Sequence, residues 1–383
     1  MRLAVVREGK ALLYIPDTRQ ALTGRGSIEP AWLDVFYNPV MTFNRDLSVI
    51  VARASLRGNF AFVDAMAGTG VRGIRYSLEV EGAEYGIVND IDPSAYRIIS
   101  MNVRLNGLEG VLRPANRDVN VLLSSAAREL GLRFDLIDVD PFGSPAPYVA
   151  SAMGALRRGG LLGVTATDLA VLGGSKPLAA LRKYWVTSLG PLRHYREVAI
   201  RVLLAYMARV AASLDKVMRP LLSISVDHYV RVFVSLDAGA RRADEMLKEN
   251  LGCLEGVTGG LVMMTRACNK GYGPLWVGPL FDAEVVRGAL GLLERLEYLE
   301  TSERLRWLLE TAKEELQLQS FFHQRLDQIC SAQRSNMPTL DEVKDHLLSL
   351  GYKFSRTHLS TVGFRTNAPP EVLSRLCSEV RRG

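Results

Sequence analysis

A strand, a tight glycine turn and a helix follow one another in residues 59–81, and this unit constrains the fold more than any other stretch. Residues 60–63 are apolar and predict a buried strand. Gly68, Gly70 and Gly73 follow in the spacing Gly-x-Gly-x-x-Gly, and a helix is predicted after them. Glycines let a backbone approach a ligand closely, and the first amides of a helix favour negative charge. The unit therefore indicates an α/β sheet that binds a nucleotide-type cofactor, without saying which one.

Charged side chains flank this turn. Asp64 ends the strand just before the glycines, as in many sites for S-adenosylmethionine (SAM). Arg72 and Arg75 stand at the start of the helix, where they either hold a carboxylate, such as that of a methionine tail, or form a solvated helix face. The next predicted strand, residues 84–92, ends in acidic residues that include Asp90. Asp90 lies about twenty residues beyond the glycine turn, which is the spacing expected for a group that accepts ribose hydroxyls.

A polar turn within residues 112–125 contains Asp118 and Val119. In methyltransferases, the loop after the third strand holds an adenine, often through one acid and one backbone N–H. Taken alone, Asp118 is better explained as a helix cap. The residues themselves leave both interpretations open.

The segment FDLIDVDPFGSPAPY, residues 134–148, begins as a buried strand and then breaks. Pro141 cannot donate to a sheet ladder, so the strand ends there and leaves Asp140 at its carboxyl end. Ligands of open α/β sheets bind at this edge. Asp140, the backbone before Pro141 and the Phe142 ring suit a planar base with an exocyclic amine, because the ring can stack and the carboxylate can accept N–H bonds. An ordinary Asp-Pro turn, with Phe142 as simple packing, is the alternative, and only the neighbouring motifs count against it.

The direction of the last strands of the sheet distinguishes two classes of nucleotide-binding fold. Residues 158–169 predict a fifth strand, and residues 220–236 predict two alternating strands around Asp227 and His228. A parallel sheet that ends in such an antiparallel hairpin is the class I methyltransferase layout, whereas dehydrogenase domains keep their sheet parallel. We therefore predict the α/β fold of a class I SAM-dependent methyltransferase, Rossmann-like with a terminal antiparallel hairpin, over residues 1–237.

The composition becomes more helical and charged after residue 237, which predicts a smaller α+β domain over residues 238–383. Its end, residues 337–369, is predicted as a helix, a strand and a basic strand carrying Arg356, His358 and Arg365. This segment is either a winged-helix-like arm that meets a phosphate backbone or a structural cap. We expect the domain to bind RNA if the first interpretation holds.

Charge and cysteine usage restrict the partners and the compartment. The formal net charge is +6 and the pI is about 9.1, which is compatible with an anionic partner. No apolar run reaches the ~18 residues that span a membrane, and we expect no signal peptide. The cysteines are scattered without a C-x-x-C pair, which argues against a zinc ribbon and a disulfide scaffold and fits a reducing, cytoplasmic location. These are Cys253, Cys268, Cys330 and Cys377.

The chain resembles the archaeal-type tRNA (guanine-N(2)-)-dimethyltransferases over essentially its whole length. That family uses SAM to place two methyl groups on the exocyclic N2 amine of a guanine at tRNA position 26. The DPFGSP and NRD blocks are the most specific parts of the resemblance. It rests on VFYNPVMTFNRD, DAMAGTGVRGIR, VNDID, IDVDPFGSP, GVTATDLAVL, LRKY, DHYVRVFV, YGPLWVGPL and RTHLSTVG.

The resemblance implies how the cofactor would be held. Arg45 of NRD and Arg72 of the glycine turn would bind the methionine end of SAM. Asp90 would bind its ribose. Asp118 and the backbone of Val119 would bind its adenine.

The resemblance also implies a base site. Asp140 would face the guanine amine and act as general base, with Pro141 fixing the angle, while Phe36 and Phe142 would sandwich the flipped ring. The implied partner is tRNA, which we expect a monomer to bind through its C-terminal domain, residues 238–383. Some relatives carry paired cysteines that look like a zinc site, but here Cys253 and Cys268 stand singly, so we predict no metal.

Three other functions compete with this one. An NAD-dependent dehydrogenase is supported only by the glycine spacing. A methyltransferase of another planar amine, adenine or a side-chain amide, would use a similar acid, proline and aromatic signature. A tRNA-binding protein with an inactive methyltransferase fold is disfavoured because Arg45, Asp90 and Asp140 are intact.

Overall fold

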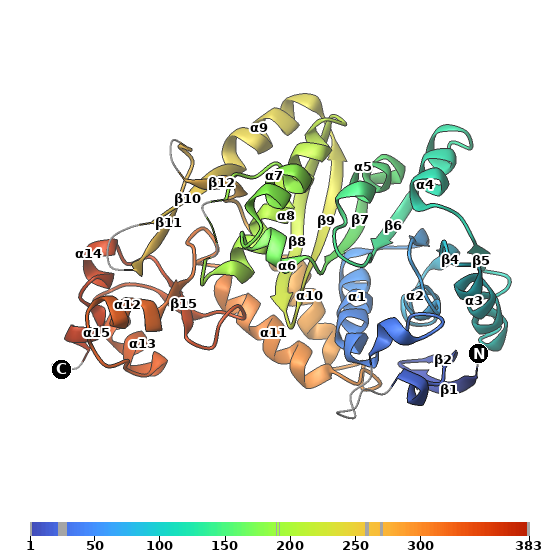
Figure 1. Cartoon of the computed structure of the whole chain (residues 1–383), viewed down its shortest axis with the longest axis horizontal. Coiled ribbons are helices and arrows are strands. Elements are labelled where there is room, and N and C mark those ends of the chain that lie inside the picture. The colour runs from blue at the N-terminus through green and yellow to red at the C-terminus, as the bar shows by residue number, and fades with distance from the viewer. Residues whose placement is uncertain are drawn as a thin grey trace. The chain divides into compact units, whose positions relative to one another are not determined.

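The computed structural model describes residues 2–21, 29–188, 190, 192–256, 260–268 and 271–380 (Figure 1). The chain divides into two compact units. The first comprises Met1–Thr165, Phe233–Ala238 and Gly288–Arg306, and the second comprises Ala166–Val232, Gly239–Arg287 and Trp307–Gly383. The predicted domain boundary at residue 237 stays a prediction.

A seven-stranded sheet has the order β5-β4-β3-β6-β7-β9-β8. The four pairs from β5 to β7 are parallel. A two-residue connection links the hydrogen-bonded neighbours β8 and β9, which makes that pair an antiparallel hairpin. The predicted mixed sheet of a class I methyltransferase is therefore confirmed. Its strands are β3 (Phe60–Asp64), β4 (Ala83–Asn89), β5 (Leu112–Ala115), β6 (Phe134–Val139), β7 (Leu156–Ala166), β8 (Lys216–Val226) and β9 (Tyr229–Ala238).

Helices connect the parallel strands and contact them in the first unit. Asp92 caps α3 by accepting from the Ser94 N–H at 2.8 Å, and Pro93 occupies the first helical position, where its missing donor costs nothing. The helix α2 contacts β3 and β4, and α3 contacts β5. The helices here are α1 (Thr42–Ser55), α2 (Val71–Glu79), α3 (Pro93–Leu105), α4 (Val119–Arg128) and α5 (Ala146–Ala155), beside the hairpin of β1 (Leu3–Glu8) and β2 (Ala11–Pro16).

The central strands β3 and β6 form the core of this sheet. Phe62, Val63, Leu136, Ile137 and Val139 are fully buried. Parallel strands covered on both faces read as continuous apolar runs rather than alternating ones, which is why the sequence marks them clearly. The same burial makes the acidic residues at the carboxyl ends of these two strands conspicuous, because Asp64 and Asp138 are buried among apolar neighbours.

The second unit holds two small antiparallel sheets, β11-β10-β12 and β13-β15-β14. Its strands are β10 (Leu251–Gly256), β11 (Val262–Thr265), β12 (Tyr272–Trp276), β13 (Gln324–Arg325), β14 (Phe354–Arg356) and β15 (Gly363–Thr366). Its main helices are α7 (Pro177–Tyr184), α8 (Tyr195–Ala212), α9 (Ala240–Asn250), α12 (Leu326–Ala332) and α13 (Leu340–Ser349), with the short α6 (Leu169–Leu172), α14 (Pro370–Leu373) and α15 (Leu376–Glu379). The helices α10 (Ala283–Leu293) and α11 (Ser302–Glu315) each have residues in both units.

The predicted helix, strand and basic strand near the end are present as α13, β14 and β15. Arg365 is fully buried and pairs with Glu197 at 2.9 Å and with Glu315 at 2.6 Å. His358 is also buried and lies 2.8 Å from Glu315. These two side chains therefore serve the interior of the unit, as a structural cap would, whereas Arg356 is exposed and pairs with Asp341.

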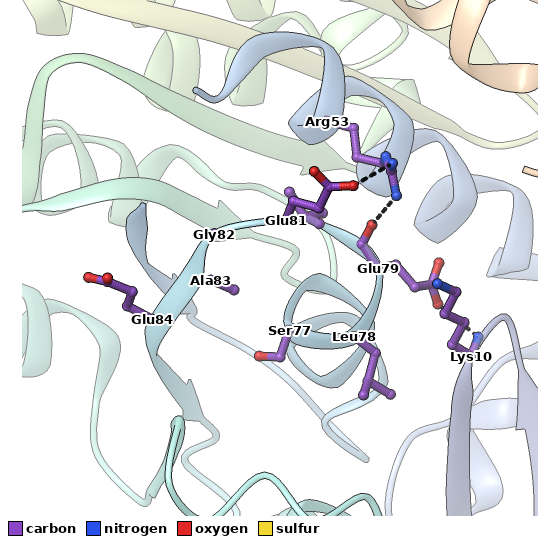
Figure 2. Close-up of a pocket in the computed structure, with 10 residues that line it drawn as sticks. Lys10, Arg53, Ser77, Leu78, Glu79, Glu81, Gly82, Ala83 and Glu84 are labelled. Carbon is purple, nitrogen blue, oxygen red and sulfur yellow. Dashed lines mark hydrogen bonds and ion pairs between the residues drawn. The ribbon is translucent and has the colours of Figure 1, made fainter. Parts of the chain in front are cut away.

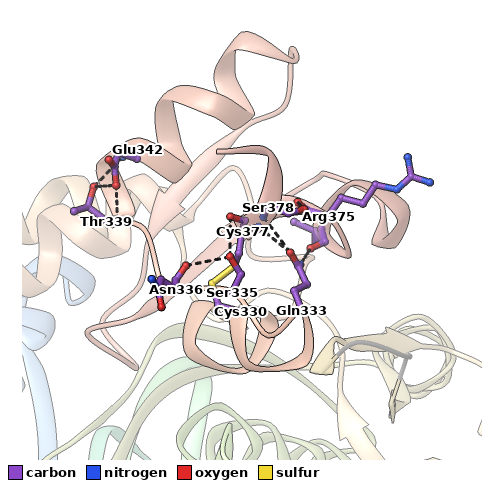
Figure 3. Close-up of a disulfide and its surroundings, with 10 residues drawn as sticks. Cys330, Gln333, Ser335, Asn336, Thr339, Glu342, Arg375, Cys377 and Ser378 are labelled. Carbon is purple, nitrogen blue, oxygen red and sulfur yellow. Dashed lines mark hydrogen bonds between the residues drawn. A yellow bond between two sulfur atoms is a disulfide. The ribbon is translucent and has the colours of Figure 1, made fainter. Parts of the chain in front are cut away.

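The four cysteines form two disulfides, Cys253–Cys268 and Cys330–Cys377, with Cα–Cα distances of 5.3 and 5.4 Å. The expectation that they would not pair was wrong. Antiparallel pairing of β10 with β11 carries the chain back past Cys253, and α12 contacts α15 at the second bridge (Figure 3). Spacing along the sequence does not reveal such neighbours. Disulfides occur in intracellular proteins of hyperthermophiles, so they do not by themselves contradict a cytoplasmic location.

The described residues form neither a membrane-spanning helix nor a cluster of metal ligands. Among the residues described, no helix is long and apolar enough to cross a membrane. Within the same part of the chain, no group of three or more His, Cys, Asp or Glu side chains is arranged to hold a metal ion. The absence of metal stays a prediction.

Candidate active site

The glycine turn between β3 and α2 packs closely against neighbouring segments of the chain. Gly68 and Gly70 have φ values of +55° and +82°, which favour glycine. A Cβ at Gly68 would lie 2.8 Å from the Phe36 carbonyl oxygen, and one at Gly73 would lie 2.7 Å from a Val88 methyl group. The turn therefore needs glycine for its conformation, as the sequence predicted, and also for these contacts within the protein. Close approach of a ligand to the turn stays a prediction.

Asp90 stands at the end of β4 and fastens this turn. Its carboxylate accepts the Gly68 N–H at 2.8 Å and the Asp92 N–H at 2.9 Å. Burial raises the pKa of Asp90, and the two backbone donors oppose that rise. The side chain is half-buried, so it stands where a sugar hydroxyl of a ligand in the turn could reach it.

Asp64 is buried at the end of β3 and accepts the Gly73 N–H at 2.8 Å. Burial raises its pKa to about 7, although the Arg72 charge opposes the rise. The neighbouring carboxylate of Asp138 adds to it. The Gly73 bond places Asp64 under the start of α2, where it supports the turn from inside.

Arg72 connects the glycine turn to the DPFG segment. One guanidinium nitrogen, Nη1, donates to Asn44 Oδ1 at 3.0 Å and to Ser48 Oγ at 2.6 Å. The other, Nη2, donates to the carboxylate of Asp140. Burial alone would lower the pKa of Arg72, but the charges of Asp138 and Asp140 raise it well above the ordinary value. Arg72 therefore stays a cation at the carboxyl edge of the sheet.

Asp140 and the aromatic pair lie on the loop that follows β6. Pro141 is buried behind Asp140, whose side chain is 19% exposed. The rings of Phe36 and Phe142 contact each other edge to face, with centroids 4.7 Å apart and an interplanar angle of 88°. Phe142 is 73% exposed. The two aromatics expected to sandwich a base are thus brought together, with one of them open to solvent.

Arg45 is placed differently from the cofactor contact that the family resemblance implies. Its guanidinium makes two bonds of 2.6 Å with Glu8, and it donates to the Asn38 carbonyl at 3.1 Å. The side chain is buried in this pairing. Burial raises the pKa of Glu8, but Arg45 and Arg75 outweigh it and lower the value to about 2. A role for Arg45 at the methionine end of SAM stays a prediction.

Arg75 belongs to the same buried cluster. It pairs with Glu8 at 3.0 Å, Asp46 at 2.7 Å and Glu79 at 2.8 Å. Its side chain is fully buried, so the solvated helix face considered for it is wrong. Arg75 does hold carboxylates, but they belong to the protein itself.

Asp118 and Val119 lie at the start of α4. The Asp118 side chain accepts the Val121 N–H at 3.0 Å as a helix N-cap, and Val119 is the first helical residue. Asp118 is exposed. The capping interpretation is therefore confirmed for Asp118, while an adenine contact through the same two residues stays a prediction.

Several residues of the site escaped the sequence analysis. Asn44 and Ser48 hold Arg72, and the buried Asp138 lies 3.5 Å from its Nε while accepting from the Tyr76 hydroxyl at 2.7 Å. Asn89 ties two loops by donating to the Ala65 carbonyl at 3.0 Å and to the carbonyl of the residue before Asp118, also at 3.0 Å. Asn44 lies in the NRD block and Asp138 in IDVDP, so both motifs carried a signal.

A separate hollow of about 280 Å³ lies at the other end of α2 (Figure 2). Lys10, Arg53 and residues 77–84 line it. Arg53 donates to the Glu79 carbonyl at 2.6 Å and pairs with Glu81 at 3.5 Å. The glycine turn is at the opposite end of the helix, so this hollow is distinct from the candidate site.

Known proteins resemble the chain over nearly all of its length. A family model described as N2,N2-dimethylguanosine tRNA methyltransferase matches residues 24–377. The tRNA (guanine(26)-N(2))-dimethyltransferase of Aeropyrum pernix is 42% identical over 96% of this chain and 95% of the relative, and that of Saccharolobus solfataricus is 35% identical over all of both chains. The structure of Trm1 from Pyrococcus horikoshii in complex with S-adenosyl-L-methionine has a TM-score of 0.85 at 34% identity, covering 97% of this chain and 98% of that one. These matches confirm the resemblance, and the chain belongs to the N2,N2-dimethylguanosine tRNA methyltransferase family.

Proposed function

We propose that this protein transfers two methyl groups from SAM to the N2 amine of the guanine at position 26 of tRNA, at the sheet edge formed by the glycine turn and the DPFG loop. The observation that carries the proposal is the arrangement of Asp140. Asp140 directly follows β6, and its carboxylate accepts a hydrogen bond from Arg72 at the start of α2. Two residues further on, the exposed Phe142 contacts Phe36. An acceptor for an amine N–H thus stands between a cofactor turn and a stacking surface.

The residues at the edge suit SAM. The cofactor supplies an electrophilic methyl group on a sulfonium. Gly68 and Gly70 open the backbone for close approach, Asp90 offers a carboxylate for ribose hydroxyls, and Arg72 offers a cation for the methionine carboxylate. The structure of a relative with the same fold is described with SAM bound, which supports this assignment.

The guanine amine is a poor nucleophile because its lone pair is delocalised into the ring. Asp140 would accept one amine N–H and take the proton as the new bond forms, which is general-base catalysis. Arg72 orients the carboxylate, and Pro141 fixes the backbone that carries it. Alignment of the amine with the methyl group supplies much of the remaining acceleration.

The aromatic pair would receive the target base. A guanine in a stacked helical junction must leave the stack before it reaches Asp140, and this costs a few kcal/mol. Stacking on aromatic rings offsets that cost. Phe36 and Phe142 now contact each other edge to face, so the exposed Phe142 would turn or shift to admit the ring. The second transfer requires that the pocket still admit the monomethylated amine.

A methylation assay with two transcripts tests the proposal. Purified protein and labelled SAM are incubated with an unmodified tRNA transcript, or with one in which guanine 26 is replaced by adenine, and the product nucleosides are analysed. We expect dimethylguanosine from the first transcript and none from the second. Label in neither transcript, despite SAM binding, would favour another planar amine as substrate. Failure to bind SAM at all would overturn the cofactor assignment and restore the dehydrogenase alternative.

Two finer properties belong to the same proposal. The protein acts as a monomer, which sedimentation with and without tRNA would check. It works in the cytoplasm, where its substrate is matured. A stable dimer required for activity would contradict the first property.

A further inference from the structure

The helix α7 presents an apolar and basic surface that the proposed reaction does not use. Leu178 and Leu181 lie three positions apart on one face of the helix, and Trp185 follows its last residue. Their side chains are 80%, 52% and 50% exposed. The opposite face is buried through Ala180 and Tyr184. A soluble helix normally turns its apolar side chains inward, so the exposed face calls for a partner.

Trp185 is held in an unusual conformation at the end of this helix. Its φ is +54°, in the left-handed region that a bulky residue rarely adopts. Arg209 of α8 fixes it by donating to the Trp185 carbonyl at 3.0 Å and to the Tyr184 carbonyl at 2.7 Å. Strained backbone that neighbouring bonds maintain is found preferentially at functional sites.

The same arginine also faces the indole ring. The guanidinium carbon of Arg209 lies 5.6 Å from the Trp185 ring centroid, and the buried Tyr206 ring lies 5.1 Å from it. Cation and aromatic neighbours immobilise the ring, so it loses little freedom when another flat group stacks on its exposed side. Trp185 is thus presented as a rigid stacking surface.

The charges along α7 favour an anionic partner. The segment from Lys176 to Trp185 contains three basic residues and no acidic one. Lys176 and Arg182 are exposed, while Lys183 lies 3.5 Å from Asp168. A flat ring at the end of a basic helix suits unpaired bases and backbone phosphates of RNA. The centre of a protein interface is, by contrast, depleted of lysine.

We propose that this surface, formed by Lys176, Leu178, Leu181, Arg182 and Trp185, is a tRNA-docking surface in which an unpaired base or exposed ribose stacks on Trp185 and phosphates meet Lys176 and Arg182. The inference rests on the proposed function, because it assigns a contact for the same substrate. It adds a binding determinant that is separate from the residues of methyl transfer.

Binding of the unmodified transcript to the full-length protein, measured by filter retention without SAM, tests the surface. Trp185→Gly removes the ring and fits the positive φ, so the fold should be retained, which thermal unfolding would check. We expect Trp185→Gly to raise the Kd for tRNA about tenfold, which is near the lower end of the cost of losing one base–aromatic stack. Trp185→Phe keeps a ring, so its Kd should stay close to that of the wild type. For the double variant Lys176→Gln/Arg182→Gln, the slope of the logarithm of the binding constant against the logarithm of the salt concentration should become shallower by about two, because two phosphate contacts are lost.

Trp307 provides the matched control, since it is 53% exposed and lies on α11. Trp307→Ala should bind tRNA as the wild type does. Equal binding by Trp185→Gly and the wild type would overturn the docking surface, as would an equal loss in Trp307→Ala. A change in oligomeric state with unchanged tRNA affinity would overturn it in favour of a protein interface. Trp185-dependent binding without methylation would support the surface and refute the reaction, whereas a wild type that retains no tRNA would overturn both.

Discussion

The guanidinium of Arg72 donates a hydrogen bond to the carboxylate of Asp140 and thereby joins the start of α2 to the DPFG loop. In the proposed site, the methionine carboxylate of SAM would be a further anionic partner of this guanidinium. Because Asn44 and Ser48 hold its other nitrogen, Arg72 can change partners without leaving its place. Under the proposed assignment, Asp140 and the methionine carboxylate would share this cation, so cofactor binding would be coupled to the position of the proposed base.

Replacement of that base tests the coupling. Asp140→Asn should lower kcat by about 100- to 10,000-fold, the range for loss of a general base. The affinity for SAM should be equal to or higher than that of the wild type, because Arg72 loses a competing carboxylate. Single-turnover methylation and calorimetric SAM binding measure the two effects. Parallel loss of SAM binding and turnover would instead make Asp140 a support for the turn.

Replacement of the exposed Phe142 ring tests whether it stacks on the target base. Phe142→Ala should leave the free energy of unfolding within about 0.5 kcal/mol of the wild type, since the side chain is 73% exposed. Methylation should fall about 5- to 150-fold, because one base stack is lost. Phe142→Tyr keeps a ring and should retain most activity. A fluorescent base analogue at position 26 would report the stacking directly, and an unchanged signal in Phe142→Ala would remove Phe142 from the base site.

The buried Asp64 should impose a pH dependence on stability. Its folded pKa of about 7 is raised above the ordinary 3.8, so the folded state binds a proton more tightly than the unfolded state. Stability from this group is therefore present at low pH and is lost as the pH rises from about 4 to 7, at up to about 1.4 kcal/mol per pH unit.

Asp64→Asn isolates that contribution. The amide oxygen can still accept the Gly73 N–H, so the turn should persist. Urea unfolding of both proteins between pH 4 and pH 7 should give a stability difference that moves in favour of the variant as the pH rises. Parallel stability curves would show that Asp64 keeps an ordinary pKa in the folded protein. Glu8 and Glu315, whose pKa values are lowered to about 2, contribute in the same way to both proteins and cancel from the difference.

The parts of the site that follow from local rules were predictable. Gly68 and Gly70 occupy a turn that needs positive φ, and Asp140 ends a strand because Pro141 cannot continue it. The contact between Phe36 and Phe142 was implied by the family resemblance and not by spacing. Motifs therefore located the edge of the sheet and most of the groups along it.

Partners from distant segments were not predictable. Glu8 neutralises Arg45 and Arg75 from a strand that carries no motif, and a single sequence offers no signal for that pairing. Arg365 reads as a surface cation in a basic strand, yet two buried carboxylates surround it. Burial of a charge depends on its counter-charge, and the fold alone brings the two together.

The disulfides lead to the last prediction, which concerns stability rather than catalysis. Cys330–Cys377 closes a separation of 47 residues and Cys253–Cys268 one of 15. Chain-entropy arguments give a stabilisation of about 4 kcal/mol for the longer loop and about 3 kcal/mol for the shorter one. The pair of substitutions Cys330→Ser/Cys377→Ser should therefore lower the free energy of unfolding more than Cys253→Ser/Cys268→Ser.

Urea unfolding of both double variants measures this order, and the wild type with reductant supplies the control. Gln333 and Ser335 bond around Cys377, so the helix contact at the longer bridge should survive loss of the sulfur link and keep the variant folded (Figure 3). Thiol titration of the denatured wild type without reductant should find no reactive cysteine. Four reactive thiols would show that the bridges are open in the isolated protein, and the stability of both variants should then match that of the wild type.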